Sequence, residues 1–428
     1  MTTALGLPGR WLGVPFLLVV AACAESLEVV TPEEVGLAAE RLARIDAVME
    51  EHIARRQIAG TVALVARRGS IAHLKAYGMR DVEAKRPMRT DTLFRIASMT
   101  KPVTSVAVMI LYEEGKFLLG DPVSRYLPEF AQMTVLPPQD SAEAAPQPAR
   151  GPITIRHLLT HTSGLTYHWN KRLGGALKEA GVPHGLLEEE GTLREKMKIL
   201  ARLPLVNHPG ERYEYGLSTD VLGALVEAVS GMTLEEFFRR RIFEPLGMED
   251  TQFFLPEDQV QRLAVVYQRE QDGPIRRAPE GPIPDEAGIV YSVTYPYRGP
   301  KRYFSGGAGL VSTAEDYARF AQMLLNGGEL DGVRLLSPKT VELMTANHVG
   351  AVEASLGFGL GFGIIRDERD LKELASIGRY GWGGFFYTDF FVDPQEELVG
   401  VFLAQLHPSG NLGLHEKFRV LATQAIIE

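Results

Sequence analysis

The sequence predicts an α/β protein built from both ends of the chain, with a mainly helical segment inserted between them. Strand-like runs occur near both termini, whereas helical periodicity dominates the middle of the chain. The strand-like runs are 61–66, 71–77, 361–365, 385–392 and 398–403. Because strands at both ends with helices between them are typical of an interrupted domain, we expect an α/β domain from 36–130 and 300–428 and a mainly helical domain at 131–299.

The N-terminal part of this domain contains two helices and a hairpin. Apolar residues recur at helical spacing over 36–57, which predicts an amphipathic helix. Two β-prone runs then flank a hairpin turn at 67–70. Since Pro102 lacks an N–H and is tolerated only in a first helical turn, the next helix must begin near Ser98, and it ends near Gly115.

The middle of the chain alternates between irregular and helical segments. Five prolines exclude regular structure from 133–152. Thr154 caps a short helix that we expect to end at Gly164. Residues 190–247 are mostly helical, with Ser218 as one cap.

The final third returns to the strand pattern after two helices. Thr313 and Ser337 are typical helix caps. The runs 385–392 and 398–403 are expected to form strands joined by a turn at Pro394, and an apolar-periodic segment predicts a terminal helix.

Composition and charge restrict the function classes. The chain has 428 residues and a net charge of −9, with no basic run, which argues against a nucleic-acid partner. Arg10 precedes an apolar run, 11–22, which has the length of a signal-peptide core and is too short to span a bilayer. No other segment is apolar enough to be a transmembrane helix.

We therefore expect residues 1–24 to be an export signal, for a periplasmic or secreted protein. Ala22-Cys23-Ala24 fits a small-x-small cleavage site, and residues 20–23 resemble a lipoprotein signal in which Cys23 would be lipidated. The alternative is an apolar N-terminus on a cytoplasmic enzyme. Cys23 is the only cysteine, so an intrachain disulfide is impossible.

The strongest chemical signal is Ser98-Met99-Thr100-Lys101. Residues three apart share a helix face, so the Lys101 amine can reach the Ser98 hydroxyl, and a lysine held among apolar side chains can act as its base. The helix N-terminus also favours negative charge developing beside Ser98 during acyl transfer. About one Ser-x-x-Lys spacing is expected by chance in a chain of this length, and Ser98 carries the only one.

Two further segments could complete such a site. Tyr215 lies just before a predicted helix, and a phenol can act as a base when neighbouring cations favour its phenolate. The glycine-rich segment 381–385 lies at the start of the predicted strand, where a backbone N–H could approach an oxyanion.

The short helix predicted after Thr154 carries His157 and His161, which must be considered as possible metal ligands. The two histidines share a helix face, but no glutamate lies between them in the zincin pattern and no third ligand is evident nearby. Structural hydrogen bonding at the helix end is the better explanation, so we predict no metal site.

Five segments, in this order along the chain, resemble the serine β-lactamase and penicillin-binding protein superfamily, and within it the class C-like family VIII carboxylesterases. The likeness covers nearly the whole chain from about residue 37 onward. The segments are Phe-Arg-Ile-Ala-Ser-Met-Thr-Lys at 94–101, Leu-Leu-Thr-His-Thr-Ser-Gly-Leu at 158–165, Tyr-Gly-Leu at 215–217, Ser-Gly-Gly-Ala-Gly-Leu at 305–310 and Trp-Gly-Gly at 382–384.

The resemblance implies an antiparallel sheet flanked by helices together with a helical domain, and it assigns roles to residues. Ser98 would be the nucleophile, Lys101 would help to deprotonate it, and Tyr215 would act first as a base and then as an acid. The backbone N–H groups of Ser98 and Phe385 would form the oxyanion hole. Substrate would also contact the neighbouring Trp382, Gly383 and Gly384. An acyl-serine would form and water would release the acid, with no cofactor.

Departures from the family pattern point to the substrate. Class C β-lactamases typically carry Tyr-x-Asn and Lys-Thr-Gly, where this chain has Tyr215-Gly216-Leu217 and Trp382-Gly383-Gly384. Leu217 and Trp382 cannot hold the amide and the carboxylate of a β-lactam, so the resemblance favours a serine carboxylesterase acting on short-chain neutral esters. The alternatives are an acyltransferase, a β-lactamase or D-Ala-D-Ala peptidase-like hydrolase, and a non-enzymatic binding module.

Overall fold

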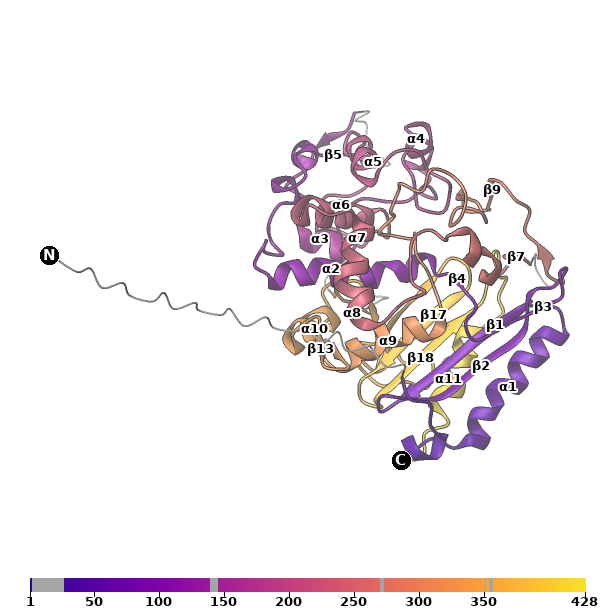
Figure 1. Ribbon diagram of the computed structural model, residues 1–428. Coiled ribbons are helices and arrows are strands. Elements are labelled where there is room, and N and C mark those ends of the chain that lie inside the picture. Colours follow the sequence, from indigo (N-terminus) through magenta and orange to yellow (C-terminus); the bar gives the residue numbers. More distant parts are fainter. Residues whose placement is uncertain (2–26, 139–144, 270–272, 351, 354–356) are drawn as a thin grey trace.

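The computed structural model describes residues 1, 27–138, 145–269, 273–350, 352–353 and 357–428 (Figure 1). The apolar run at 11–22 and Cys23 lie outside these ranges, so the export signal stays a prediction. Among the described residues, no helix is both long and apolar enough to cross a bilayer.

One antiparallel sheet joins the two ends of the chain and confirms the predicted fold class. Its eight strands lie in the order β14-β15-β16-β17-β18-β1-β2-β3. β18 (Leu398–Leu403) pairs directly with β1 (Gly60–Arg67), which pairs with β2 (Ser70–Asp81) across the predicted hairpin turn. The remaining strands are β3 (Arg86–Pro87), β14 (Gly357–Phe358), β15 (Gly363–Ile364), β16 (Tyr380–Gly384) and β17 (Thr388–Asp393).

Helices cover both faces of the sheet (Figure 1). They are α1 (Ala39–Ala54) and α11 (Leu414–Thr423) on one face, with α9 (Ala314–Leu325) on the other, where α2 (Thr100–Glu113) packs in the same core. The side chains of β1 alternate accordingly: Val62 and Leu64 join the core of α2 and α9, whereas Ala63 and Val65 join that of α1 and α11. Because both faces are buried, β1 consists largely of apolar residues.

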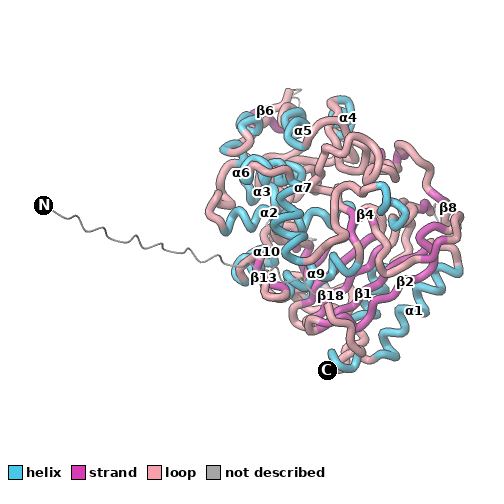
Figure 2. The backbone as a smooth tube through the Cα atoms, in the orientation of Figure 1, coloured by secondary structure: helices cyan, strands magenta, loops and turns pink. Residues whose placement is uncertain are grey.

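Further helices pack around α2, and loops connect several of them (Figure 2). They are α3 (Ile155–Leu159), α4 (Gly174–Glu179), α5 (Leu193–Leu200), α6 (Ser218–Ser230), α7 (Leu234–Phe238) and α8 (Glu244–Leu246). Their buried side chains belong to the same continuous core as α2 and α9. A single shared core does not mark where one domain would end and the next begin, so the domain boundaries at 131 and 300 stay a prediction.

The remaining elements are short. Two-residue strands pair as β5 (Thr134–Val135) with β6 (Gln147–Pro148), β7 (Tyr267–Gln268) with β8 (Arg276–Arg277), β9 (Ile283–Pro284) with β10 (Val290–Tyr291), and β12 (Glu329–Leu330) with β13 (Val333–Arg334). α10 (Pro338–Thr345) follows β13. Among the predicted caps, the hydroxyls of Thr154, Thr313 and Ser337 accept hydrogen bonds from helical N–H groups, as expected.

Two helix boundaries differ from the prediction. The helix after Thr154 ends at Leu159 rather than at Gly164, because His161 adopts a left-handed conformation with φ 53° that an α-helix cannot continue through. Ser218 is the first residue of α6 and not its cap; its hydroxyl instead hydrogen-bonds to that of Ser163 at 2.8 Å.

The predicted strand 385–392 was wrong at its start. The preceding glycine-rich segment forms its own strand, β16, and the chain turns at 385–387 before β17 begins at Thr388. The sequence did not indicate β16 because three of its five residues are glycine, which has low strand propensity. The predicted strand 361–365 is likewise only the two residues of β15.

Buried ionisable groups in this fold make the free energy of unfolding depend on pH in opposite directions. The rings of His168 and His184 lie 4.9 Å apart between centroids, and burial lowers the pKa of His168 to about 4 and that of His184 to about 3. Both are neutral in the folded protein above these values. Burial also raises the pKa of Glu189 and of Asp316 to about 7, which favours their protonated forms.

We expect His184→Gln to weaken the loss of stability in acid. Below the unfolded histidine pKa of about 6.5 the unfolded chain binds a proton that folded His184 does not, so this residue makes the free energy of unfolding fall toward pH 4 by up to about 1.4 kcal/mol per pH unit. Glu189 and Asp316 act in the opposite direction, so the readout is the difference in slope between the two proteins. Urea unfolding at pH 6.5, 5.5 and 4.5 measures it, and equal slopes would contradict the assignment.

Candidate active site

The segment that carries Ser98 is held in place by backbone pairing. β4 (Phe94–Arg95) pairs with β11 (Val311–Ser312), and the Ile96 N–H donates to Leu310 O at 3.1 Å. Ser98 then lies in a 3₁₀ turn, Ala97–Met99, directly before α2. The predicted position at a helix N-terminus is therefore found, with a tighter turn than expected.

Lys101 reaches Ser98, as the three-residue spacing predicts. Its Nζ lies 3.2 Å from Ser98 Oγ and donates to Gly307 O at 2.8 Å. The same atom lies over two aromatic faces, 4.7 Å from the Tyr215 ring centroid and 5.3 Å from that of Tyr167. With 2% of its surface exposed, this amine makes its contacts almost entirely with protein.

The loop at 305–310 is bound tightly to the start of α2. Thr104 Oγ1 donates to Gly306 O at 2.7 Å, and the Leu310 N–H donates to Thr100 Oγ1 at 3.1 Å. A Cβ on Gly306 would lie 2.7 Å from Thr219 O, so only glycine permits this approach. The sequence identified this segment only as part of a resemblance, and its carbonyl contact to Lys101 was missed.

Asp220 is a second group that sequence reasoning missed. Its fully buried carboxylate accepts hydrogen bonds from Ser305 Oγ at 2.7 Å and Tyr303 OH at 3.2 Å. Burial raises the pKa of Asp220, while the Ser305 hydrogen bond and the charge of Lys101 oppose that rise. Asp220 lies in the first turn of α6, and its position in the sequence does not indicate these contacts.

Tyr215 lies in a cluster of aromatic rings beside Lys101. The neighbouring ring centroids lie between 4.8 and 6.0 Å from its own, and they belong to His161, Tyr167, Trp169 and Trp382. Trp382 Nε1 donates to the Tyr215 hydroxyl at 3.3 Å. Three predicted residues, Lys101, Tyr215 and Trp382, therefore meet at one place.

Leu217 belongs to the core. Its side chain is fully buried among the apolar residues shared by α2 and α6. The position at which class C enzymes carry asparagine is thus occupied by a packing residue.

The glycine-rich end of β16 lies against the Ser98 turn. A Cβ on Gly384 would lie 2.4 Å from Ile96 O, which explains the need for glycine there. In the part of the chain that the structure describes, the backbone N–H of Phe385 donates to no other residue, and that of Ser98 donates to none outside its own turn. The Phe385 ring stacks on His407 with centroids 3.7 Å apart.

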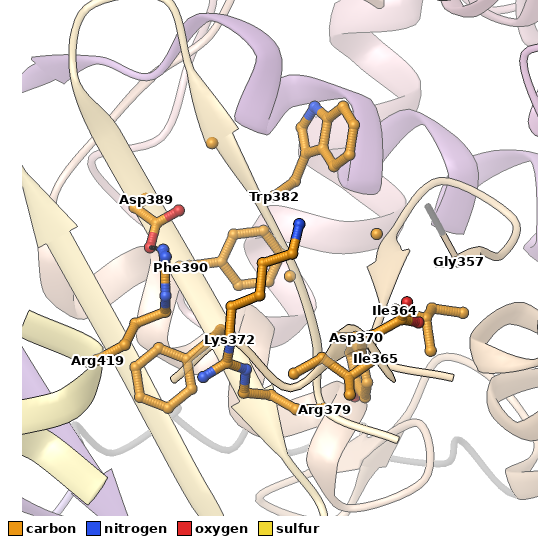
Figure 3. Close-up of a pocket in the computed structure, with 15 residues that line it drawn as sticks. Gly357, Ile364, Ile365, Asp370, Lys372, Arg379, Trp382, Asp389, Phe390 and Arg419 are labelled. Carbon is orange, nitrogen blue, oxygen red and sulfur yellow. Dashed lines mark hydrogen bonds and ion pairs between the residues drawn. The ribbon is translucent and has the colours of Figure 1, made fainter. Parts of the chain in front are cut away.

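A cavity of about 420 Å³ lies beside this strand (Figure 3). Trp382, Gly381 and Gly383 line it, together with the ion pair between Arg419 and Asp389 at 2.7 Å. Ser98, Lys101 and Tyr215 do not line it. The cavity therefore adjoins the Ser98 cluster through Trp382 but does not contain it.

His157 and His161, the two histidines considered as metal ligands, accept hydrogen bonds from backbone N–H groups. Thr154 N–H donates to His157 Nδ1 at 3.2 Å, and Gly216 N–H donates to His161 Nδ1 at 3.4 Å. Within the described ranges, no group of three or more histidine, cysteine or acidic residues is arranged to hold a metal ion.

This arrangement of a serine beside a buried lysine, an aromatic cluster and a glycine-rich strand end agrees with the comparison to known families. A family model described as Beta-lactamase matches residues 45–424. The chain belongs to the beta-lactamase family.

Curated relatives of this beta-lactamase family protein include esterases and acyltransferases. It is 36% identical to Esterase EstB of Burkholderia gladioli, over 83% of this chain and 88% of that protein. It is 30% identical to the Monacolin J acid methylbutanoyltransferase of Aspergillus terreus, over 88% of this chain and 93% of the relative. Among solved structures, "EstCE1, a hydrolase with promiscuous acyltransferase activity" superposes with a TM-score of 0.78 and 30% identity, covering 91% of this chain and 99% of that one.

These findings place the protein among the serine hydrolases with an acyl-enzyme chemistry. They also support the predicted relation to the serine β-lactamase and penicillin-binding protein superfamily.

We expect Trp382→Phe to lower kcat/KM for an ester about 2–13-fold, because the change keeps an aromatic ring but removes the N–H that bonds to the Tyr215 hydroxyl, an interaction of about 0.5–1.5 kcal/mol. Steady-state kinetics with p-nitrophenyl acetate measure the effect. Trp169→Phe is the matched control, since Trp169 is stacked beside Tyr215 at 6.0 Å and 8° without a hydrogen bond to it. An equal effect of both changes would show that ring packing and not the N–H matters.

Proposed function

We propose that this protein is a carboxylesterase that hydrolyses short-chain acyl esters through an acyl-Ser98 intermediate. The observation that carries the proposal is the position of Lys101 Nζ, which contacts Ser98 Oγ at 3.2 Å while facing the Tyr215 ring at 4.7 Å. An activated hydroxyl next to a buried amine and a phenol is an arrangement suited to nucleophilic catalysis.

In the proposed acylation, Ser98 Oγ attacks the ester carbonyl while Lys101 helps to pass the hydroxyl proton to Tyr215. The backbone N–H groups of Ser98 and Phe385 stabilise the oxyanion that forms. When the tetrahedral intermediate collapses, Tyr215 returns the proton to the departing alcohol. Water then attacks the acyl-serine with Tyr215 as base, and the acid is released.

The proposed preference for neutral esters rests on Trp382 and Leu217. The indole N–H of Trp382 is used by the Tyr215 hydroxyl, and Leu217 is buried in the core. Neither residue offers the ammonium or amide group that would hold the carboxylate and amide of a β-lactam. The rings of Tyr167 and Trp382 beside Tyr215 offer apolar contact to a short acyl group.

We expect Ser98→Ala to abolish hydrolysis of p-nitrophenyl acetate, because no other group in the proposed mechanism can form the acyl-enzyme. Lys101→Ala and Tyr215→Phe should each reduce kcat by ~10²–10⁴, the range of general acid–base contributions. Initial rates and the melting temperature of each variant are the measurements. Residual activity in folded Ser98→Ala comparable to wild type would refute the mechanism.

Acyl transfer is a second candidate function. The 30% identity to a methylbutanoyltransferase and the fold shared with a hydrolase of promiscuous acyltransferase activity favour it. Both outcomes begin from one acyl-enzyme, and they differ only in whether water or an alcohol attacks it.

We expect added n-butanol to divert the acyl group of p-nitrophenyl butyrate into butyl butyrate, detected by gas chromatography beside butyric acid. The ratio of new ester to acid should rise with the alcohol concentration, because both nucleophiles compete for one intermediate. Ser98→Ala should lose both products together. Acid as the sole product at every alcohol concentration would restrict the protein to hydrolysis, and a nitrocefin assay run in parallel separates out the β-lactamase alternative.

A further inference from the structure

His161 holds the chain on both sides of Tyr215. Its backbone carbonyl accepts the N–H of Glu214 at 2.7 Å, and its ring Nδ1 accepts the N–H of Gly216 at 3.4 Å. The imidazole also packs against the Tyr215 ring, with centroids 4.8 Å apart and planes tilted by 46°. One residue thus contacts the amide before Tyr215, the amide after it and its ring.

The unusual backbone of His161 makes this double contact possible. Its φ of 53° is left-handed, a conformation that is uncommon outside glycine, although asparagine, aspartate and histidine adopt it more often than other residues do. A residue is held in such a conformation when surrounding contacts compensate its cost. Here the turn directs both the carbonyl and the ring nitrogen of His161 toward the segment at 214–216.

The segments containing His161 and Tyr215 are packed too closely to slide past each other. A Cβ on Gly216 would lie 2.4 Å from Leu165 O, and Thr166 Oγ1 donates to a Glu214 carboxylate oxygen at 2.5 Å. A displacement of the Tyr215 segment would therefore break contacts at several points.

The hydrogen bond to Gly216 also fixes the form of the imidazole. Because Nδ1 accepts an N–H, that nitrogen carries no proton, and the neutral ring has its proton on Nε2. Burial lowers the pKa of His161 well below its usual value, and the nearby Lys101 lowers it further. A neutral acceptor is therefore the stable form beside the lysine.

We propose that His161 is a positioning residue, whose neutral ring holds the phenol of Tyr215 in its catalytic place beside Lys101. The inference rests on the proposed function, because it assumes that Tyr215 transfers protons. His161 does not touch the reacting atoms in this proposal and acts only through Tyr215.

Two substitutions at this position separate the hydrogen-bond acceptor from the backbone conformation. His161→Asn keeps an acceptor at the position of Nδ1 and tolerates positive φ, whereas His161→Gly also tolerates positive φ but offers no acceptor. We expect His161→Gly to lower kcat and kcat/KM for p-nitrophenyl acetate together by ~10–100-fold, the range for displacing a catalytic group by about 1 Å. His161→Asn should recover most of that loss.

A double-mutant cycle with Tyr215→Phe tests whether His161 acts through Tyr215. In the Tyr215→Phe background we expect His161→Gly to cause little further loss, because the group being positioned is already gone. A purely structural role would give the same fold-loss in both backgrounds, and that result would overturn the proposal. Equal activity of the asparagine and glycine variants would overturn it as well.

Two controls keep this test separate from the proposed function. Melting temperatures of all variants, and the labelling of Ser98 by a fluorophosphonate in His161→Gly, show whether the fold and the nucleophile persist. If Ser98→Ala retains activity, the proposed function itself fails. If Ser98 is essential but His161→Gly matches wild type, only the positioning role fails.

Discussion

The burial of the Lys101 amine is the constraint on which the rest of the site depends. A lysine amine removed from water must find hydrogen-bond partners within the protein, because an unpaired polar group in the interior is costly. Lys101 finds them at Ser98 Oγ and Gly307 O, with aromatic faces of Tyr215 and Tyr167 completing its surroundings. Four segments that are distant in the sequence must therefore converge within a few ångströms.

Glycines make that convergence sterically possible. Gly306 touches the carbonyl of Thr219, Gly384 touches that of Ile96, and Gly216 touches that of Leu165, at distances where a Cβ would collide. Each of these contacts joins two segments of the site. The sheet supplies the frame, because pairing of β18 with β1 brings the C-terminal strands, including β16, to the side of α2.

The sequence predicted those parts of the fold and site that depend on local spacing. The contact of Lys101 with Ser98 follows from three residues of helix, and β1, β2 and β18 follow from runs of apolar residues. The position of Tyr215 before a helix made it only a weak candidate, and the family resemblance supplied its expected role.

Tertiary contacts made the remaining features unpredictable. The carbonyl of Gly307 has no side chain to identify it, and Asp220 lies in a helix whose pattern is otherwise ordinary. The strand β16 was missed because glycines gave it no strand-like composition, although its pairing with β17 is regular. His161 was correctly assigned a hydrogen-bonding role at a helix end, but its partner is the Tyr215 segment, which is 55 residues away in the sequence.

The same packing bears on the choice between water and alcohol as the final acceptor. Rings of Tyr167, Trp169 and Trp382 surround Tyr215, and only Trp169 among them is substantially exposed, at 37%. Water beside these apolar rings gains few hydrogen bonds from them, whereas the alkyl part of an alcohol gains contact with them. Water outcompetes an alcohol for the acyl-enzyme mainly because it is far more concentrated. Aromatic rings around Tyr215 would reduce that advantage by favouring the alcohol, so the same structural feature bears on both the proposed esterase and the proposed acyltransferase reaction.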